Sequence, residues 1–138
     1  MRQHSAVLAI GTRRGLAEIT PAVRDAVRES GVQEGLCSLF RRHTSASLVV
    51  QENADPSVRR DLESFLSGLV PDGHPGFTHL AEGEDDMSAH MKAALLRSSE
   101  QIPIAAGELV LGTWQGIYLW EHRDGAHRRH VVVHVLGE

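Results

Sequence analysis

The sequence predicts an α+β fold: a mainly antiparallel β-sandwich with about three helices, formed by a single domain over residues 1–138. Stretches typical of strands occur at both ends of the chain and helical stretches occupy its middle, which is not the pattern of a βαβ repeat. The length of 138 residues, 41% of them apolar, is enough for one buried core.

The first elements follow from turn and cap residues. Residues 4–12 are predicted to form a strand. A helix follows, which Thr20 is expected to cap, Pro21 to open and Gly31 to end. Alternating and β-branched residues predict the next two strands at residues 35–43 and 45–53.

The second half of the chain is expected to hold two helices and then strands only. Asp55 is predicted to cap the second helix, which Pro56 opens. The third helix is predicted from about Asp85 to about Arg97. Asp124 and Gly125 predict a hairpin between the last two strands. The final strands are predicted at residues 101–104, 107–112, 114–122 and 129–137.

Apolar side chains at regular spacing predict which faces are buried. Met87, Met91 and Leu95 form a stripe that is expected to pack the third helix on the core. The second helix has a similar face, made by Val58, Leu62, Phe65, Leu66 and Leu69. Val131, Val133 and Val135 are predicted on one face of the last strand. One face of a strand also gathers aromatic residues for core or interface: Trp114, Tyr118 and Trp120.

Composition narrows the class of protein. The net charge of −4 argues against nucleic-acid binding. No apolar run approaches the roughly 18 residues of a membrane span, so no membrane partner is expected, and the protein is interpreted as cytoplasmic. Cys37 is expected to be a small core residue. Basic residues occur in four pairs that could serve a small anionic ligand: Arg13-Arg14, Arg41-Arg42, Arg59-Arg60 and Arg128-Arg129.

Residues 79–90, HLAEGEDDMSAH, carry the first candidate site. In a helix that starts near Asp85, Asp86 and His90 lie four residues apart on one face, and the preceding loop could fold His79 over the helix start. Two imidazoles and a carboxylate could hold Zn²⁺ with one position open. The alternative is a charged helix start that favours the helix dipole, with His90 an ordinary surface or packed histidine.

Residues 41–56 and 111–123 carry further candidates. His43 could be a ligand or a general base, and Thr44 could hold a phosphate; the alternative is a polar strand edge. Asn53 follows at the far end of that strand, where it could simply form a turn. Gln115 could reach a ligand as donor and acceptor. Lys92 could bind a phosphate if its side of the helix faces the site, and is otherwise a solvated lysine.

These motifs together resemble one family. The segments HTSASLVVQENADPSVRRDL, HLAEGEDDMSAHMKAALLRSS, IPIAAGELVLGTWQGIYLWEHR and VVVHVLGE are similar to those of the secondary thiamine-phosphate synthase family, the YjbQ-like proteins. The resemblance spans the chain from about residue 5 to its end. One departure is Arg97, where the family usually has glycine.

The resemblance implies a homotrimer with sites near the subunit contacts and a weak thiamine-phosphate synthase activity. That reaction joins a hydroxymethylpyrimidine diphosphate to a thiazole phosphate and releases pyrophosphate, so the expected partner is a small phosphorylated substrate. The motif positions of the family coincide with residues already named, and they add Glu82. The motif positions are His43, Thr44, Asn53, Asp55, His79, Glu82, Asp86, His90 and Gln115.

Two hypotheses about function follow. In the first, His43, His79 and His90 hold a divalent metal, zinc if three imidazoles bind it and magnesium if carboxylates dominate. Asp86 then orients a histidine or acts as a base, with Glu82 and His43 as further catalytic candidates. In the second, the protein is a trimeric module that binds a metal or a small ligand and has no important turnover.

Overall fold

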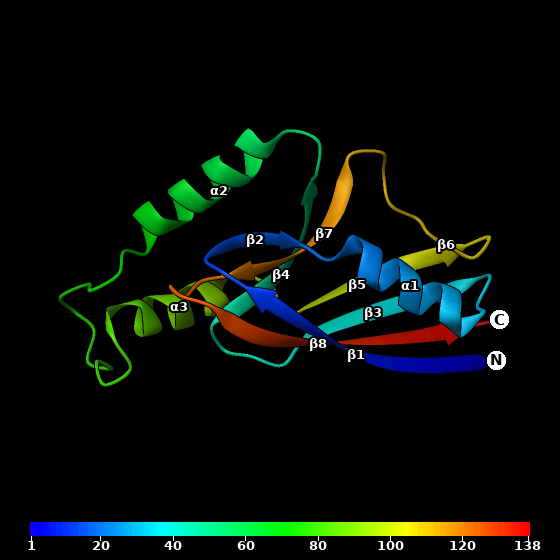
Figure 1. The fold of residues 1–138 in the computed structure, drawn as a ribbon, viewed down its shortest axis with the longest axis horizontal. Coiled ribbons are helices and arrows are strands. Elements are labelled where there is room, and N and C mark those ends of the chain that lie inside the picture. Colours follow the sequence, from blue (N-terminus) through cyan, green and yellow to red (C-terminus); the bar gives the residue numbers. More distant parts are fainter.

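The computed structural model describes residues 1–138 as two antiparallel sheets and three helices (Figure 1). The larger sheet has the strand order β1-β8-β3-β5-β6 and the smaller one β2-β7-β4. The strands are β1 (Arg2–Thr12), β2 (Gly15–Glu18), β3 (Gly35–Arg41), β4 (Ala46–Glu52), β5 (Ser99–Ala105), β6 (Glu108–Leu109), β7 (Gln115–Glu121) and β8 (His127–Gly137). The helices are α1 (Thr20–Ser30), α2 (Pro56–Leu69) and α3 (Glu84–Leu95). The predicted α+β fold is confirmed.

The hydrophobic core forms where α1 packs against strands of both sheets. Val23 and Val27 of α1 are at most 2% exposed. Full burial of such a side chain stabilises the fold by roughly 1.5–3 kcal/mol. The predicted inner face of β8 is confirmed, since Val131, Val133 and Val135 are fully buried. Cys37 lies in the same core, and burial raises the pKa of its thiol to about 11.

Helix boundaries follow the predicted caps with one exception. The Asp55 side chain accepts a hydrogen bond from the Ser57 N–H at 2.9 Å, and Gly31 ends α1 with a φ of 69°. Thr20, however, is the first residue of α1 and makes no capping hydrogen bond within its helix. Its hydroxyl instead accepts a hydrogen bond from the Ile117 N–H at 2.8 Å. The predicted cap is therefore wrong, because this hydroxyl ties α1 to β7.

The Asp124-Gly125 turn does not close a hairpin, and that prediction is also wrong. Gly125 has the left-handed φ of 79° that such turns favour. However, β7 pairs with β2 and β4, whereas β8 pairs with β1 and β3. The turn therefore carries the chain from one sheet to the other. Strand β2 was not predicted from the sequence. The strand predicted at residues 107–112 is longer than β6, which has only two residues.

Several predicted apolar faces lie on the outside of the protomer. Met91 and Leu95 of α3 are 39% and 62% exposed, and Phe65 and Leu69 of α2 are 74% and 61% exposed. The predicted packing of the α3 stripe on the core is wrong. The buried side of α3 carries three polar residues, Asp86, Ser88 and Lys92, of which Asp86 and Ser88 form hydrogen bonds with other segments.

Helix α2 projects from the body of the molecule, and a long loop joins it to α3 (Figure 1). Its one buried residue is Leu66. Trp114 precedes β7 and is 64% exposed, whereas Tyr118 and Trp120 are buried, so the three aromatic residues do not share one buried face. None of the three helices has the length and apolar character needed to cross a membrane.

Candidate functional site

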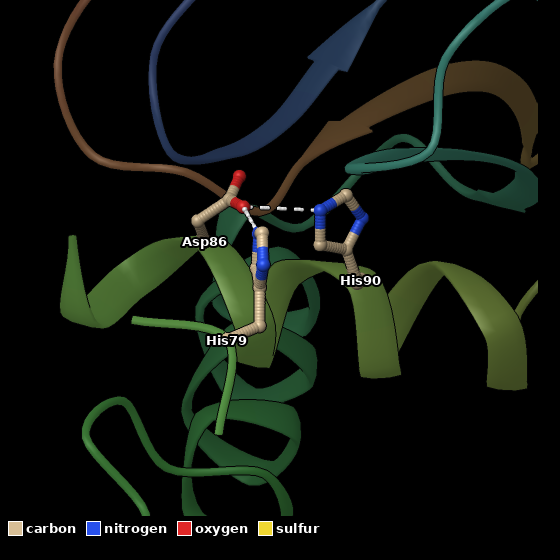
Figure 2. A group of neighbouring side chains, drawn as sticks. All are labelled: His79, Asp86 and His90. Carbon is tan, nitrogen blue, oxygen red and sulfur yellow. Dashed lines mark hydrogen bonds and ion pairs between the residues drawn. The ribbon is translucent and has the colours of Figure 1, made fainter. Parts of the chain in front are cut away.

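Three side chains from residues 79–90 meet at the start of α3 (Figure 2). His79 Nε2 lies 2.8 Å and His90 Nε2 lies 3.0 Å from the same oxygen, Asp86 Oδ2. One ligand atom from each of the three residues can be chosen so that all lie within 4.8 Å of one another. The helical spacing places Asp86 and His90 on one face, and the preceding loop brings His79 to it. We call this group the His79–Asp86–His90 cluster.

The carboxylate of the cluster is buried, whereas its two imidazole rings are partly exposed to solvent. The Asp86 side chain is only 7% exposed, whereas the His79 and His90 side chains are 46% and 32% exposed. A carboxylate that is buried in this way needs compensating donors or cations. The two imidazoles are therefore accessible to a small solute, and the carboxylate between them is fixed in place.

A backbone carbonyl determines the protonation of His90. His90 Nδ1 lies 2.9 Å from the Thr44 carbonyl oxygen, which can only accept a hydrogen bond, so Nδ1 must carry a proton. In the neutral ring, Nε2 is then a lone pair that faces the lone pairs of Asp86 Oδ2. Such a contact needs a proton between the two atoms, on the ring or on the carboxyl group, or a bound cation. Metal-ligating histidines are commonly held in this way, by a hydrogen bond from the other ring nitrogen.

Arg123 holds the carboxylates at the start of α3. Its Nε lies 3.3 Å from Asp85 Oδ2 and 3.5 Å from Asp86 Oδ1, and its Nη2 donates to the Glu82 carbonyl. Burial would raise the pKa of Asp85, but hydrogen bonds from Arg123 and from the Asp124 N–H outweigh it and lower that pKa. Burial opposes the charge of Arg123, yet the hydrogen bond with Asp85 raises its pKa. Arg123 thus engages Asp86 Oδ1 and leaves Oδ2 to the histidines.

Glu82 and His43 lie outside the cluster in this protomer. Glu82 is exposed, and its backbone carbonyl, not its carboxylate, makes the contact with Arg123. His43 Nε2 accepts a hydrogen bond from the His130 N–H at 2.7 Å, and the two rings are stacked. Burial, together with the charge of Arg129, lowers the pKa of His43. His43 is therefore a neutral ring with its Nε2 lone pair already in use.

Asn53 and Gln115 lie at the opposite end of β4 from Thr44. The seven residues of β4 separate Thr44 from Asn53, and a strand of that length spans roughly 20 Å. The Asn53 amide donates to the Gln115 carbonyl at 3.4 Å, and the Gln115 side chain accepts from the Gly112 N–H. Asn53 thus joins the end of β4 to β7, and the Gln115 side chain closes the turn before β7. The structure does not bring either residue to the cluster.

Lys92 lies on the far side of α3 from His90. Two residues along a helix correspond to a rotation of about 200°, and Lys92 is only 1% exposed. Burial and the charge of Arg14 lower the pKa of Lys92, against the opposite effect of nearby carboxylates. Lys92 is therefore not a solvated lysine, and its side of the helix does not face the cluster.

Arg97, where the resemblance implies a glycine, leaves the cluster unobstructed. Its side chain is 72% exposed and lies 3.5 Å from Glu100. Its backbone carbonyl accepts a hydrogen bond from the Leu48 N–H, which joins the end of α3 to β4. The guanidinium therefore points to solvent and does not enter the cluster.

A small pocket opens beside His90, and its arginine, Arg41, belongs to one of the basic pairs that the sequence offers for a small anionic ligand. The pocket has a volume of about 260 Å³ and is lined by Arg41, Thr44, His90, Ala93 and Ala94. Arg41 donates to the carbonyls of His43 and Ala93 and has no carboxylate partner. Its pKa is lowered by burial. An unpaired guanidinium next to an imidazole pair suits an anionic ligand, and we call this space the Arg41 pocket.

Two ionisable residues at the end of β7, Glu121 and His122, are fully buried, which the sequence did not predict. Glu121 is fully buried and pairs with Arg129, and His122 is fully buried beside Ser47, with Ser47 Oγ and His122 Nε2 2.9 Å apart. Burial, with the charge of Lys92, lowers the pKa of His122 to about 3, so this ring is neutral. Both residues belong to the motif LGTWQGIYLWEHR, in which alternation gave no hint that charged groups are buried.

Comparison with known proteins places the chain in a family. The family profile described as "UPF0047 protein YjbQ-like" matches residues 5–138. The UPF0047 protein sll1880 of Synechocystis is 51% identical over 138 residues, 99% of this chain and 94% of that protein. A YbjQ-like protein of Sulfolobus solfataricus superposes with a TM-score of 0.84 at 28% identity, covering 99% of both chains. A Clostridium acetobutylicum member of the yjbq/upf0047 family superposes with a TM-score of 0.82 at 39% identity, covering 94% of this chain and 99% of that one. The chain therefore belongs to the YjbQ-like UPF0047 family.

Proposed function

We propose that the His79–Asp86–His90 cluster binds a divalent cation and that the protein uses it to act on a small phosphorylated substrate. The observation that carries the proposal is the His90 ring: the Thr44 carbonyl holds the proton on Nδ1, and Nε2 lies 3.0 Å from Asp86 Oδ2, a contact that a bound cation would satisfy. Two imidazoles and one carboxylate are a three-ligand set typical of catalytic zinc, with one position left for water or substrate. Magnesium prefers oxygen ligands and fits this set less well.

The residues around the cluster each have a definite part in this proposal. The Thr44 carbonyl keeps His90 in the ligating tautomer, and Arg123 holds Asp86 in place through Oδ1. Arg41, without a carboxylate partner, offers charge and N–H donors to a phosphate in the Arg41 pocket. A bound cation would supply Lewis-acid stabilisation of negative charge on phosphate oxygens.

The reaction we propose is the thiamine-phosphate synthase type of transfer, which rests on the motif resemblance because the names of the family relatives state no reaction. A bond forms between the pyrimidine methylene carbon and the thiazole nitrogen. The bond from that carbon to the diphosphate oxygen breaks, and pyrophosphate leaves with the electron pair. Negative charge grows on the leaving group, so Arg41 is well suited to stabilise it.

A homotrimer is part of the same proposal. Large apolar residues on the outside of α2 and α3 would be covered by a second copy: Phe65, Leu69, Met91 and Leu95. Residues that lie outside the cluster of one chain would then be candidates to complete the site of another. They are His43 and Glu82, which lie next to groups that contact the cluster, and Asn53 and Gln115, which lie at the far end of β4.

Metal binding is tested by equilibrium dialysis of untagged protein against Zn²⁺, followed by elemental analysis. Wild type is expected to retain about one zinc per chain, and both His90→Ala and His79→Ala to lose it. His134→Ala is the matched control, because His134 lies in β8 with Ser5 as its partner. Wild type without stoichiometric zinc, or a control that loses as much zinc as His90→Ala, would contradict the proposal.

Turnover separates an enzyme from a binding module. The two substrates named above are incubated with zinc-loaded protein, and released pyrophosphate is measured. Wild type is expected to release pyrophosphate, and Arg41→Ala to retain zinc but release pyrophosphate at least tenfold more slowly. Full zinc occupancy without pyrophosphate release would instead favour a metal-binding module.

A further inference from the structure

A second pocket, which shares no lining residue with the cluster or with the Arg41 pocket, is lined by several arginine side chains. It lies between the start of β2 and one turn of α2 and has a volume of about 360 Å³. Arg14, Arg59 and Arg60 line it, and the one carboxylate among its lining residues belongs to Glu63. We call it the α2–β2 pocket. In a chain with a net charge of −4, three guanidiniums around one small pocket are an unusual concentration of positive charge.

The one carboxylate of the pocket is already engaged. Glu63 Oε2 accepts a hydrogen bond from the Trp120 indole N–H at 2.6 Å, and Glu63 Oε1 accepts from Ser67 Oγ. Glu63 therefore holds α2 against the smaller sheet, and it forms no ion pair with the arginines. Its negative charge reduces the positive charge of the pocket without removing it.

Two of the three arginines have no acidic partner. Arg60 takes part in no hydrogen bond or ion pair of the structure, and it lies on an exposed position of α2. Arg59 donates one hydrogen bond, to the Tyr118 hydroxyl at 3.1 Å, and its guanidinium lies 5.8 Å from the centre of that ring. Arg59 is thus held in place by a neutral group, and its remaining N–H donors are available.

Arg14 forms a fixed wall of the pocket. Its Nη2 lies 2.8 Å from Asp72 Oδ2 and its Nε 2.9 Å from Asp124 Oδ1, which leaves the Nη1 donors without a partner. Lys92, only 1% exposed and without a hydrogen bond, lies close enough to Arg14 for the two positive charges to affect each other. An anion near Arg14 would reduce this repulsion.

We propose that the α2–β2 pocket binds the phosphate group of a small phosphorylated molecule, held by Arg59, Arg60 and the free donors of Arg14. Arginine forks match phosphate oxygens in geometry and charge, and the pocket is too small for a macromolecule. The site does not depend on a metal in the His79–Asp86–His90 cluster, since the two share no residue.

Titration calorimetry at low ionic strength tests the proposal with two probes, inorganic phosphate and phenyl phosphate, on protein dialysed against EDTA. The titrations use an Arg41→Ala background, which removes the phosphate contact proposed for the Arg41 pocket. In that background one equivalent of a probe is expected to bind, and adding Arg59→Ala or Arg60→Ala should weaken binding about tenfold or more. Arg128→Ala is the matched control: it removes the same charge from an exposed position outside the pocket. It should bind as the Arg41→Ala background does, and so should His90→Ala.

The remaining outcomes overturn the proposal. If the metal-free Arg41→Ala background binds neither probe, the pocket is not a phosphate site. If Arg128→Ala weakens binding as much as Arg60→Ala, the effect is one of net charge. If His90→Ala alone abolishes binding, the probe binds at the cluster. Circular dichroism of Arg60→Ala, whose side chain supports nothing in the fold, keeps loss of binding distinct from loss of structure.

Discussion

Glu121 is a single residue on which the fold depends strongly. Its side chain is fully buried and accepts hydrogen bonds from Thr12 Oγ1 at 2.6 Å and from Arg129 Nε at 2.7 Å. Burial alone would raise its pKa, but the hydrogen bonds from Arg129 and Thr12 outweigh burial and lower the pKa from 4.5 to about 2. Because the folded pKa is depressed, the stabilisation is complete above pH 4.5 and is lost as the pH falls towards 2.

We therefore expect Glu121→Gln to lower the free energy of unfolding by about 3–5 kcal/mol at pH 7, because Arg129 is left buried without its charge partner. The loss relative to wild type should be smaller at pH 3, where wild type has already lost part of this contribution. Urea unfolding at both pH values measures it, with the exposed Glu138→Gln as control. Equal losses at pH 7 and pH 3 would contradict the pKa argument.

Among single residues, those of the cluster could be grouped from the sequence and His43 could not. Asp86 and His90 are one helical turn apart, and His79 lies only seven residues before Asp86, so local geometry is enough. The position of His43 depends on its hydrogen bond with the His130 N–H, 87 residues away. No local pattern reports such a contact.

At the scale of elements, α2 depends on its cap because little else secures its start. Asp55 accepts the Ser57 N–H, and the helix buries only Leu66. We expect Asp55→Ala to lower the urea concentration at the midpoint of unfolding and Asp55→Asn to restore most of the loss. Urea unfolding measures the change. An Asn variant as unstable as the Ala variant would show that the charge, and not the cap, is responsible.

Helix α3 shows why the spacing of apolar residues alone does not identify the buried face of a helix. Its stripe of Met91 and Leu95 is largely exposed, while Asp86 and Lys92 are buried. The apolar pattern assumes that the core of one protomer is the only apolar environment available. Buried polar groups are tolerated here because partners from distant segments reach them, as Arg123 does for Asp86.

At the scale of the whole molecule, the exposed apolar faces bear on assembly. We expect the protein to sediment as a species of about 45 kDa, three copies of the 15.1 kDa chain. Phe65→Glu should shift it to monomer by placing a charge on a side chain that is 74% exposed in the single chain. Sedimentation velocity measures both. Glu108→Lys, on the edge strand β6, is the control, and a wild type that sediments as monomer would contradict the trimer.

The sheet order could be predicted only in part. The sequence identified most strands and their antiparallel character, because alternation and turn residues are local signals. It assigned β7 and β8 to one hairpin, since Asp124-Gly125 has the composition of a tight turn. Which sheet each strand joins is decided by the packing of α1 and by partners over a hundred residues away, such as β1 for β8.

The placement of β8 between β1 and β3 has a consequence for folding kinetics. The register pairs Arg2 with Gly137, so the middle of the larger sheet forms only when the two ends of the chain have met. Closing so long a loop costs conformational entropy before the strand pairing can compensate for it. Domains rich in distant contacts therefore fold slowly, in roughly milliseconds to seconds. Until then β1 and β3 would present unpaired edges to other chains, so refolding yield should fall as protein concentration rises.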